Sequence, residues 1–211
     1  MFIAVDGIDG SGKTTLVKNL RDHFASQNPV ITKEPTDNSQ WGQKMRIAAA
    51  EGRLSREIEL EYFHKDRLEH IATVILPAIN QGRIVITDRY VDSMLAYQAN
   101  TPEEANVLYE NVVEEILIPD ITFILVCSVE IGLERIRKRE ADKGLSHFEN
   151  DNALKRAAAI YESRKGDHYA FCDASGTSEN TLRQALETLK QRFFKKPTDR
   201  LMVNSGVYTS E

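Results

Sequence analysis

The sequence has little cysteine, no long apolar run and no targeting segment at its start. Cys127 and Cys172 are the two cysteines among 211 residues, and they lack CxxC spacing, so we expect buried thiols in a reducing compartment rather than a disulfide. No apolar stretch approaches the ~20 residues that span a bilayer, and residues 1–5 run straight into a glycine-rich motif. These absences favour a cytoplasmic protein without a membrane partner.

The sequence also lacks an excess of basic charge. The net charge is −5, and no run of Lys and Arg forms a stripe, so the electrostatic pattern of a nucleic-acid binder is missing. A small anionic ligand would therefore have to be attracted by a local site. With 41% hydrophobic and 28% charged residues, and with no repeat or low-complexity tract, the chain is typical of a globular protein with one domain.

Hydrophobic patterning alternates short apolar runs with helical spacing. A charge-rich helical region follows Pro35, and Gly82 stands where helix C-caps favour glycine. Such alternation predicts an α/β fold, a five-stranded parallel sheet with helices on both faces. We expect residues 1–196 to form this domain and residues 197–211, which lack periodicity, to form a tail. The predicted strands are 2–5, 30–32, 83–88, 121–126 and 169–172, and the predicted helices are 14–25, 56–80, 103–117, 130–140, 152–165 and 181–194.

The segment from Gly7 to Thr14, GIDGSGKT, fits the phosphate-binding loop (P-loop) pattern GxxxxGK[ST] and lies between a predicted strand and a predicted helix, as that motif requires. Its glycines let backbone N–H groups curl around phosphate oxygens at the positive end of the helix. Lys13 would reach the β- and γ-phosphates, and Thr14 would bind Mg²⁺. The alternative is a glycine-rich turn with a solvated lysine. The predicted ATP site is Gly7, Asp9, Gly10, Ser11, Gly12, Lys13, Thr14 and Thr15, with Mg²⁺ held by Thr14 and Asp88.

A P-loop does not identify a kinase, because switches, motors and transporters share it. The segment Asp88-Arg89-Tyr90 follows the third predicted strand, at the edge of the sheet where ligands of open α/β folds bind. Arg89 has the planar guanidinium that clamps a phosphate with two hydrogen bonds. The alternative is a surface arginine paired with Asp88 or Asp92.

On these and further residues, the chain resembles the thymidylate kinase family over roughly residues 2–190. The resemblance implies a P-loop nucleoside monophosphate kinase that uses ATP and Mg²⁺ to convert dTMP to dTDP for dTTP synthesis. It also implies a mobile lid near residues 139–150 and a homodimer. The matching segments, in order, are Gly7–Thr15, Lys33–Pro35, Phe63–His70, Asp88–Tyr90 leading to Ala96–Gln98, Pro119-Asp120, Leu133–Arg139, Phe148-Glu149 and Asp173-Ala174.

The resemblance assigns roles to individual residues around a pyrimidine deoxynucleoside monophosphate. Phe63 would stack on the base and Arg67 would donate to a base carbonyl, and a helix places residues four apart on one face. Gln98 would pair with the base edge, and Tyr97 would crowd the sugar 2′ position. Without the resemblance, Phe63 is interpreted as core, and Arg67 and Arg46 as solvated helix charges. The implied acceptor site is Asp9, Glu34, Arg46, Phe63, Arg67, Arg89, Ser93, Met94, Tyr97 and Gln98; the implied catalytic residues are Lys13, Arg89, Asp9 and Arg139, with Arg135 binding ATP.

Several positions depart from the family pattern. Met94 stands where relatives commonly have Ser or Thr beside the base, and the glycines expected after Pro35 and after Gln98 are missing. Gly10 stands where one branch has arginine, so Arg135, Arg139 and Lys143 become the candidates for stabilising the transferred group. His147 precedes Phe148-Glu149, where relatives often have Lys or Arg. Two alternatives therefore remain: a kinase of the same fold for another deoxynucleotide, such as a 5-substituted dUMP, and a nucleotide-binding regulatory protein with weak transfer.

Overall fold

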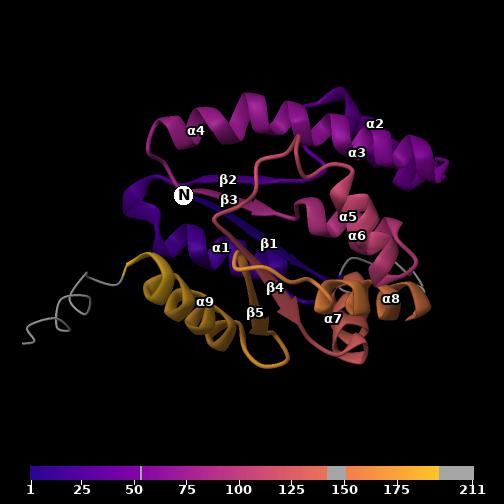
Figure 1. Ribbon diagram of the computed structural model, residues 1–211. Coiled ribbons are helices and arrows are strands. Elements are labelled where there is room, and N and C mark those ends of the chain that lie inside the picture. The colour runs from indigo at the N-terminus through magenta and orange to yellow at the C-terminus, as the bar shows by residue number, and fades with distance from the viewer. Residues whose placement is uncertain (53, 142–150, 195–211) are drawn as a thin grey trace, which may run out of the picture.

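The computed structural model describes residues 1–52, 54–141 and 151–194, which form an α/β fold around a parallel five-stranded sheet (Figure 1). The predicted tail, 197–211, and the lid positions 142–150, including Lys143 and His147, lie outside the described residues. The sheet order is β2-β3-β1-β4-β5, which confirms the predicted sheet. The strands are β1 (Phe2–Gly7), β2 (Val30–Lys33), β3 (Val85–Asp88), β4 (Ile121–Val126) and β5 (Tyr169–Asp173).

The central strands are apolar because both faces of a parallel sheet are covered. Every residue of β1 is buried, and Ile121 to Leu125 of β4 are buried as well. In the register of the sheet, Val5 of β1 pairs with Asp88 of β3. Since β1 and β3 end at the same edge, the loops that follow them emerge side by side.

Helices cover both faces of the sheet, as predicted. Helices α1 (Lys13–His23) and α9 (Ser178–Phe193) pack together, α1 against β1 and β3 and α9 against β5. Helices α5 (Val91–Gln98) and α8 (Asp151–Glu162) pack together against β1 and β4. Helix α7 (Val129–Ala141) packs against α8. Within the described residues, no helix is both long and apolar enough to cross a membrane, and both cysteines are buried and free.

The predicted helix over 56–80 is confirmed as one continuous helical stretch. It consists of α3 (Arg56–His70), a π-helical segment (Ile71–Ile75) and α4 (Leu76–Asn80), and it runs beside β2 in Figure 1. Ser55 caps its start by accepting a hydrogen bond from the Ile58 N–H. Gly82 ends it with φ 70° and an N–H bond to the Ile79 carbonyl of 2.8 Å, so the predicted glycine cap is confirmed.

Two helices around the site were not assigned from the sequence as separate elements. Helix α2 (Gln40–Glu51) is capped by Ser39, whose hydroxyl accepts from the Gly42 N–H at 2.9 Å, and it packs against α3. In α5, seven of the eight residues are buried, so this helix lacks the polar face that gives amphipathic helices their period.

The predicted helix over 103–117 is wrong at its C-terminal end, because α6 spans Pro102–Glu110 and turns follow over 111–115. Asn111, Val112 and Val113 are weaker helix formers than alanine or leucine. The acidic side chain of Glu110 at the end of α6 also opposes the helix dipole. The predicted strand over 83–88 begins later as well, at Val85.

Candidate active site

The phosphate loop connects β1 to α1 and depends on backbone conformations that favour glycine. Gly7, Gly10 and Gly12 have φ values of 143°, 78° and 101°, which side chains rarely adopt. A Cβ atom at Gly10 would lie 2.2 Å from the carbonyl oxygen of Gly132 on α7, whereas one at Gly12 would face open space. Helix α7 therefore packs directly against the loop at Gly10.

Lys13 lies against the loop that precedes it. Its Nζ donates to the carbonyls of Gly7 and Ile8 at 3.0 and 2.8 Å and lies 3.5 Å from Asp9 Oδ1. Burial, helped by the positive charge of Arg89, lowers the pKa of Lys13 to about 8. Binding of an anion in the loop would therefore stabilise this desolvated ammonium group.

Thr14, at the start of α1, and Asp88, at the end of β3, bring two oxygen ligands together. Thr14 Oγ1 donates to Asp88 Oδ2 at 2.6 Å. Among the described residues, there is no group of three or more His, Cys, Asp or Glu side chains that could hold a metal. An oxygen pair of this kind fits Mg²⁺, which binds one or two protein oxygens and takes its other ligands from phosphates and water.

Arg89 occupies a strained position directly after β3 and pairs with the phosphate loop. Its φ is 74°, which is uncommon for a residue other than glycine. Nη2 donates to Asp9 Oδ1, and Nη1 donates to Ser93 Oγ at 3.1 Å. Burial alone would raise the pKa of Asp9, but Arg89 and Lys13 outweigh it, and the pKa is lowered. The predicted alternative of a surface pair with Asp88 or Asp92 is wrong.

A cavity of about 340 Å³ opens beside Arg89, between α3 and α5. All ten residues that the family resemblance assigned to the acceptor site line it, together with four that were not predicted. Glu59, Phe63 and Arg67 follow one another at four-residue spacing on α3 and share one face of that helix. The unpredicted lining residues are Pro35, Met45, Glu59 and Tyr90.

Arg67 is fully buried at one end of this cavity, so it is not a solvated helix charge. Nε and Nη2 both donate to Glu34 Oε2, at 3.0 and 2.7 Å. Nη1 points toward Met94, with 3.7 Å between Nη1 and Sδ. His70 also bonds Glu34, at 3.1 Å. Glu34 therefore orients the guanidinium and leaves Nη1 on the side of Met94.

Arg46 of α2 and Tyr97 of α5 close the cavity toward the phosphate loop. Arg46 Nη2 donates to the Pro35 carbonyl at 2.9 Å and lies 2.6 Å from Asp37 Oδ1. The hydroxyl of Tyr97 accepts from the Asp9 N–H at 3.1 Å. Tyr97 therefore ties the phosphate loop to α5.

A second cavity, of about 660 Å³, lies over the phosphate loop. Lys13, Thr14 and Arg139 line it, and so do Thr15, Asp88 and Arg135. Five residues line both this cavity and the acceptor cavity, and the two therefore share a wall; these are Asp9, Glu34, Pro35, Arg46 and Arg89.

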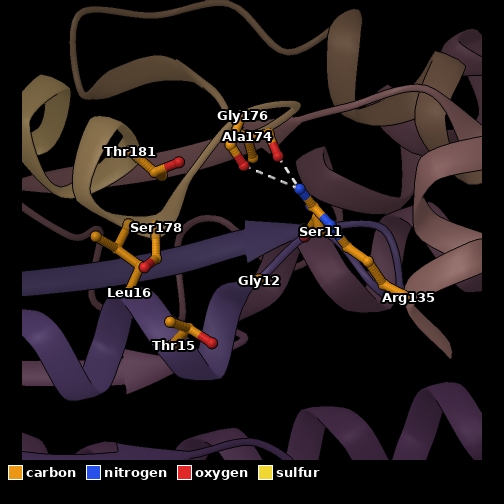
Figure 2. A pocket seen from close by; sticks show the side chains of 9 residues that line it. All are labelled: Ser11, Gly12, Thr15, Leu16, Arg135, Ala174, Gly176, Ser178 and Thr181. Carbon is orange, nitrogen blue, oxygen red and sulfur yellow. Dashed lines mark hydrogen bonds between the residues drawn. The ribbon is translucent and has the colours of Figure 1, made fainter. Parts of the chain in front are cut away.

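A third cavity, of about 210 Å³, lies between α1 and the loop after β5 (Figure 2). Arg135 of α7 spans it, donating to the Ala174 and Gly176 carbonyls at 2.8 and 3.1 Å and to the Gly10 carbonyl at 3.4 Å. Ser11, Gly12 and Thr15 line it from the phosphate loop. The other lining residues, which were not predicted as site residues, are Leu16, Ala174, Gly176, Ser178 and Thr181.

A buried carboxyl lies behind Arg89 and was not predicted. Asp6 Oδ1 accepts from Ser93 Oγ at 2.5 Å, and Ser93 also bonds Tyr161 at 2.9 Å. Burial, with a contribution from Asp92, raises the pKa of Asp6 to about 7. Asp92 itself pairs with Arg164 at 2.7 Å. The Ser93 hydroxyl thus links Asp6 to Arg89 through hydrogen bonds.

Comparisons with known proteins agree with this geometry. A family model described as thymidylate kinase matches residues 5–185. The chain is 39% identical over 189 residues to a thymidylate kinase of Xanthomonas campestris pv. campestris (strain B100), covering 88% of this chain and 81% of the relative. It is 37% identical over 190 residues to a thymidylate kinase of Xylella fastidiosa (strain 9a5c), covering 88% of each chain.

Proposed function

The chain belongs to the thymidylate kinase family, and from this premise we propose that it transfers the γ-phosphoryl group of ATP to dTMP, giving dTDP and ADP. One observation carries the proposal: the phosphate-loop cavity and the acceptor cavity share Asp9, Arg46 and Arg89 in their common wall. Transfer in line requires the donor and acceptor phosphates to meet. A shared wall that carries two arginines is where the two phosphates can meet.

On the donor side, Lys13 stabilises the β- and γ-phosphates. Its ammonium exchanges the carbonyls of Gly7 and Ile8 for phosphate oxygens, and the buried site makes that charge interaction strong. Arg135 binds ATP beside the loop after β5. Arg139, which is exposed and lines the phosphate-loop cavity, supplies a further positive charge to the transferred group.

Thr14 and Asp88 would hold Mg²⁺. When bound, the ion would supply positive charge that offsets the charge developing during transfer. The protein's own part is to keep the two oxygen ligands together, one at the start of α1 and one at the end of β3.

On the acceptor side, Arg89 and Arg46 hold the phosphate of dTMP, and Asp9 keeps Arg89 in place. Ser93 fixes the second arm of Arg89. The base lies farther into the cavity, where Phe63 stacks on it, Arg67 donates to it, and Met94 and Gln98 complete the wall. Glu34 holds Arg67, and Tyr97 crowds the sugar 2′ position.

We also propose that residues 1–196 form the catalytic domain and that the enzyme acts in the cytoplasm as a homodimer. Exposed apolar side chains on neighbouring helices support self-association: Ile47 lies on α2 and Ile58 on α3, and these helices pack together. Sedimentation analysis at micromolar concentration should give twice the monomer mass of 23.9 kDa. A monomer at that concentration would contradict the dimer.

The proposed reaction is tested by steady-state kinetics with a panel of acceptors: dTMP, dUMP, 5-hydroxymethyl-dUMP, dCMP and dGMP. We expect dTMP to have the highest kcat/KM and dGMP to be refused. A better rate with 5-hydroxymethyl-dUMP would favour the alternative of a modified acceptor, and ATP binding without transfer to any acceptor would favour a regulatory protein.

The same assay with Arg89→Ala tests the acceptor assignment. The KM for dTMP should rise about tenfold or more, because a hydrogen-bonded charge contributes ~1.5–3 kcal/mol, while the KM for ATP changes little. Arg21→Ala is the matched control, since Arg21 is an exposed arginine on α1. Equal losses for both substrates would move Arg89 out of the acceptor site.

A further inference from the structure

Glu59 is a buried carboxyl that no part of the proposed mechanism uses. It is 2% exposed, lines the acceptor cavity and lies one helical turn before Phe63 on α3. Its Oε2 accepts a hydrogen bond of 2.7 Å from Nε2 of Gln98, at the C-terminal end of α5. Glu59 and Gln98 thus join the two helices that form the walls of the base pocket.

This contact fixes which end of the Gln98 amide faces a ligand. A carboxylate offers only acceptors, whereas an amide has a donating nitrogen and an accepting oxygen. Reversing the amide would set its oxygen against Glu59 and lose the bond. Within the part of the chain that the structure describes, no group donates to Gln98 Oε1. The contact takes one of the two Nε2 hydrogens, and the oxygen is therefore the acceptor that Gln98 can offer to a base.

The side chains next to Gln98 determine how much its amide oxygen matters for recognising a base. Met94, one turn earlier on α5, is buried and presents a thioether, which is a weak acceptor. Arg67 Nη1 lies beside Met94 and can only donate. The base end of the cavity therefore combines an acceptor from Gln98 with a donor from Arg67.

We propose that Glu59 is a positioning residue that selects pyrimidines carrying a hydrogen on N3, by holding the oxygen of Gln98 toward the base. This inference rests on the proposed function. Thymine and uracil have an N3–H donor and a C4 carbonyl acceptor, which match Gln98 Oε1 and Arg67 Nη1. Cytosine has an N3 acceptor and a C4 amino donor, so both contacts oppose it. A site with buried polar groups rejects a base that leaves them unpaired.

The test is the ratio of kcat/KM for dTMP to that for dCMP in Glu59→Gln. Glutamine can donate or accept, so the Gln98 amide becomes free to turn, and we expect the ratio to fall about tenfold or more. The ratio for dTMP to dUMP should stay unchanged, because both bases carry N3–H. The KM for ATP should also stay unchanged. Glu57→Gln is the control, since Glu57 makes the same chemical change on the exposed side of α3.

A double-mutant cycle separates this role from simple support of the pocket. In a Gln98→Ala background, Glu59→Gln should have no further effect on the dTMP to dCMP ratio, because the amide through which Glu59 acts is gone. Should Glu59→Gln fail to fold, Gln98→Ala alone still decides, since it must lower the same ratio. An unchanged ratio in either single variant overturns the inference. Failure of the wild type to phosphorylate dTMP would instead overturn the proposed function.

Discussion

Replacing Gly10 with alanine should destabilise the protein more than alanine at either of two comparable glycines. Gly10 combines a left-handed backbone, φ 78°, with a Cβ position 2.2 Å from the Gly132 carbonyl oxygen. Gly12 has the strained backbone, φ 101°, without any neighbour within 4 Å. Gly132 has an ordinary helical backbone, but its Cβ would lie 2.8 Å from the Asp9 carbonyl oxygen. The three positions therefore separate strain from close contact.

The magnitudes follow from these two causes. A left-handed conformation costs a side chain ~1–2 kcal/mol, and overpacking costs ~1–3 kcal/mol. Gly12→Ala should then lose about 1–2 kcal/mol of unfolding free energy, and Gly10→Ala about 2–5 kcal/mol. Gly132→Ala gains ~1 kcal/mol from better helix propensity, so its net loss is about 0–2 kcal/mol.

The measurement is urea unfolding of the three variants without nucleotide, followed by circular dichroism, with unfolding free energies compared at one temperature. If the unfolding free energy of Gly10→Ala lies within about 0.5 kcal/mol of that of Gly12→Ala, the contact between the loop and α7 contributes nothing, and our account of how α7 packs on the loop is refuted.

The same contact explains why an arginine at position 10 does not suit this chain. Its Cβ would displace α7, which carries Arg135 and Arg139.

The remaining predictions address the pKa of Asp6, the buried Arg67 and the exposed Arg139. Because the pKa of Asp6 rises from 3.8 to about 7 on folding, its contribution to stability is present at low pH and is lost as pH rises through 7. Asp6→Asn should therefore gain about 2.5 kcal/mol of unfolding free energy relative to the wild type between pH 5 and pH 8. The same difference in urea unfolding at both pH values would contradict this. Arg67→Lys should raise the KM for dTMP about tenfold and lower the melting temperature, since lysine cannot replace a guanidinium that bonds Glu34 twice; an unchanged KM would remove Arg67 from the base pocket. Arg139→Ala should lower kcat about 100-fold while the KM for dTMP is kept, and an unchanged kcat would exclude it from the transferred group.

The parts of the site that follow from local sequence were predictable. The phosphate loop is contiguous, and its glycines and lysine act through backbone conformation and short reach, so Gly7 to Thr14 could be placed from the pattern alone. The sheet was predictable for a similar reason, because parallel strands buried on both faces appear as apolar runs. Residues of the acceptor site came from the family resemblance, and the structure brings all ten of them to one cavity.

The rest depends on contacts between segments that are distant in sequence. Asp9 and Arg89 are 80 residues apart, and Gln98 and Glu59 are 39 apart, so neither pair has a local pattern. Glu59 had one available indication, its four-residue spacing before Phe63 and Arg67. Helix α5 was missed because burial on all sides removes the amphipathic period. The helix predicted over 103–117 was too long because α6 ends at weak helix formers and an acidic side chain. Glycine or proline would have marked that end more clearly in the sequence.

The central claim is that this site moves a phosphoryl group from ATP to dTMP by electrostatic positioning around Lys13. Its most direct test is to quantify dTDP and ADP by ion-exchange chromatography after incubating ATP, Mg²⁺ and dTMP with the wild type and with Lys13→Ala. We predict dTDP and ADP in equal amounts with the wild type. The variant should retain its circular dichroism spectrum and lose at least about 1,000-fold in rate, because the buried charge on the transferred group is gone. ADP released without dTDP, or undiminished transfer by Lys13→Ala, would contradict the claim.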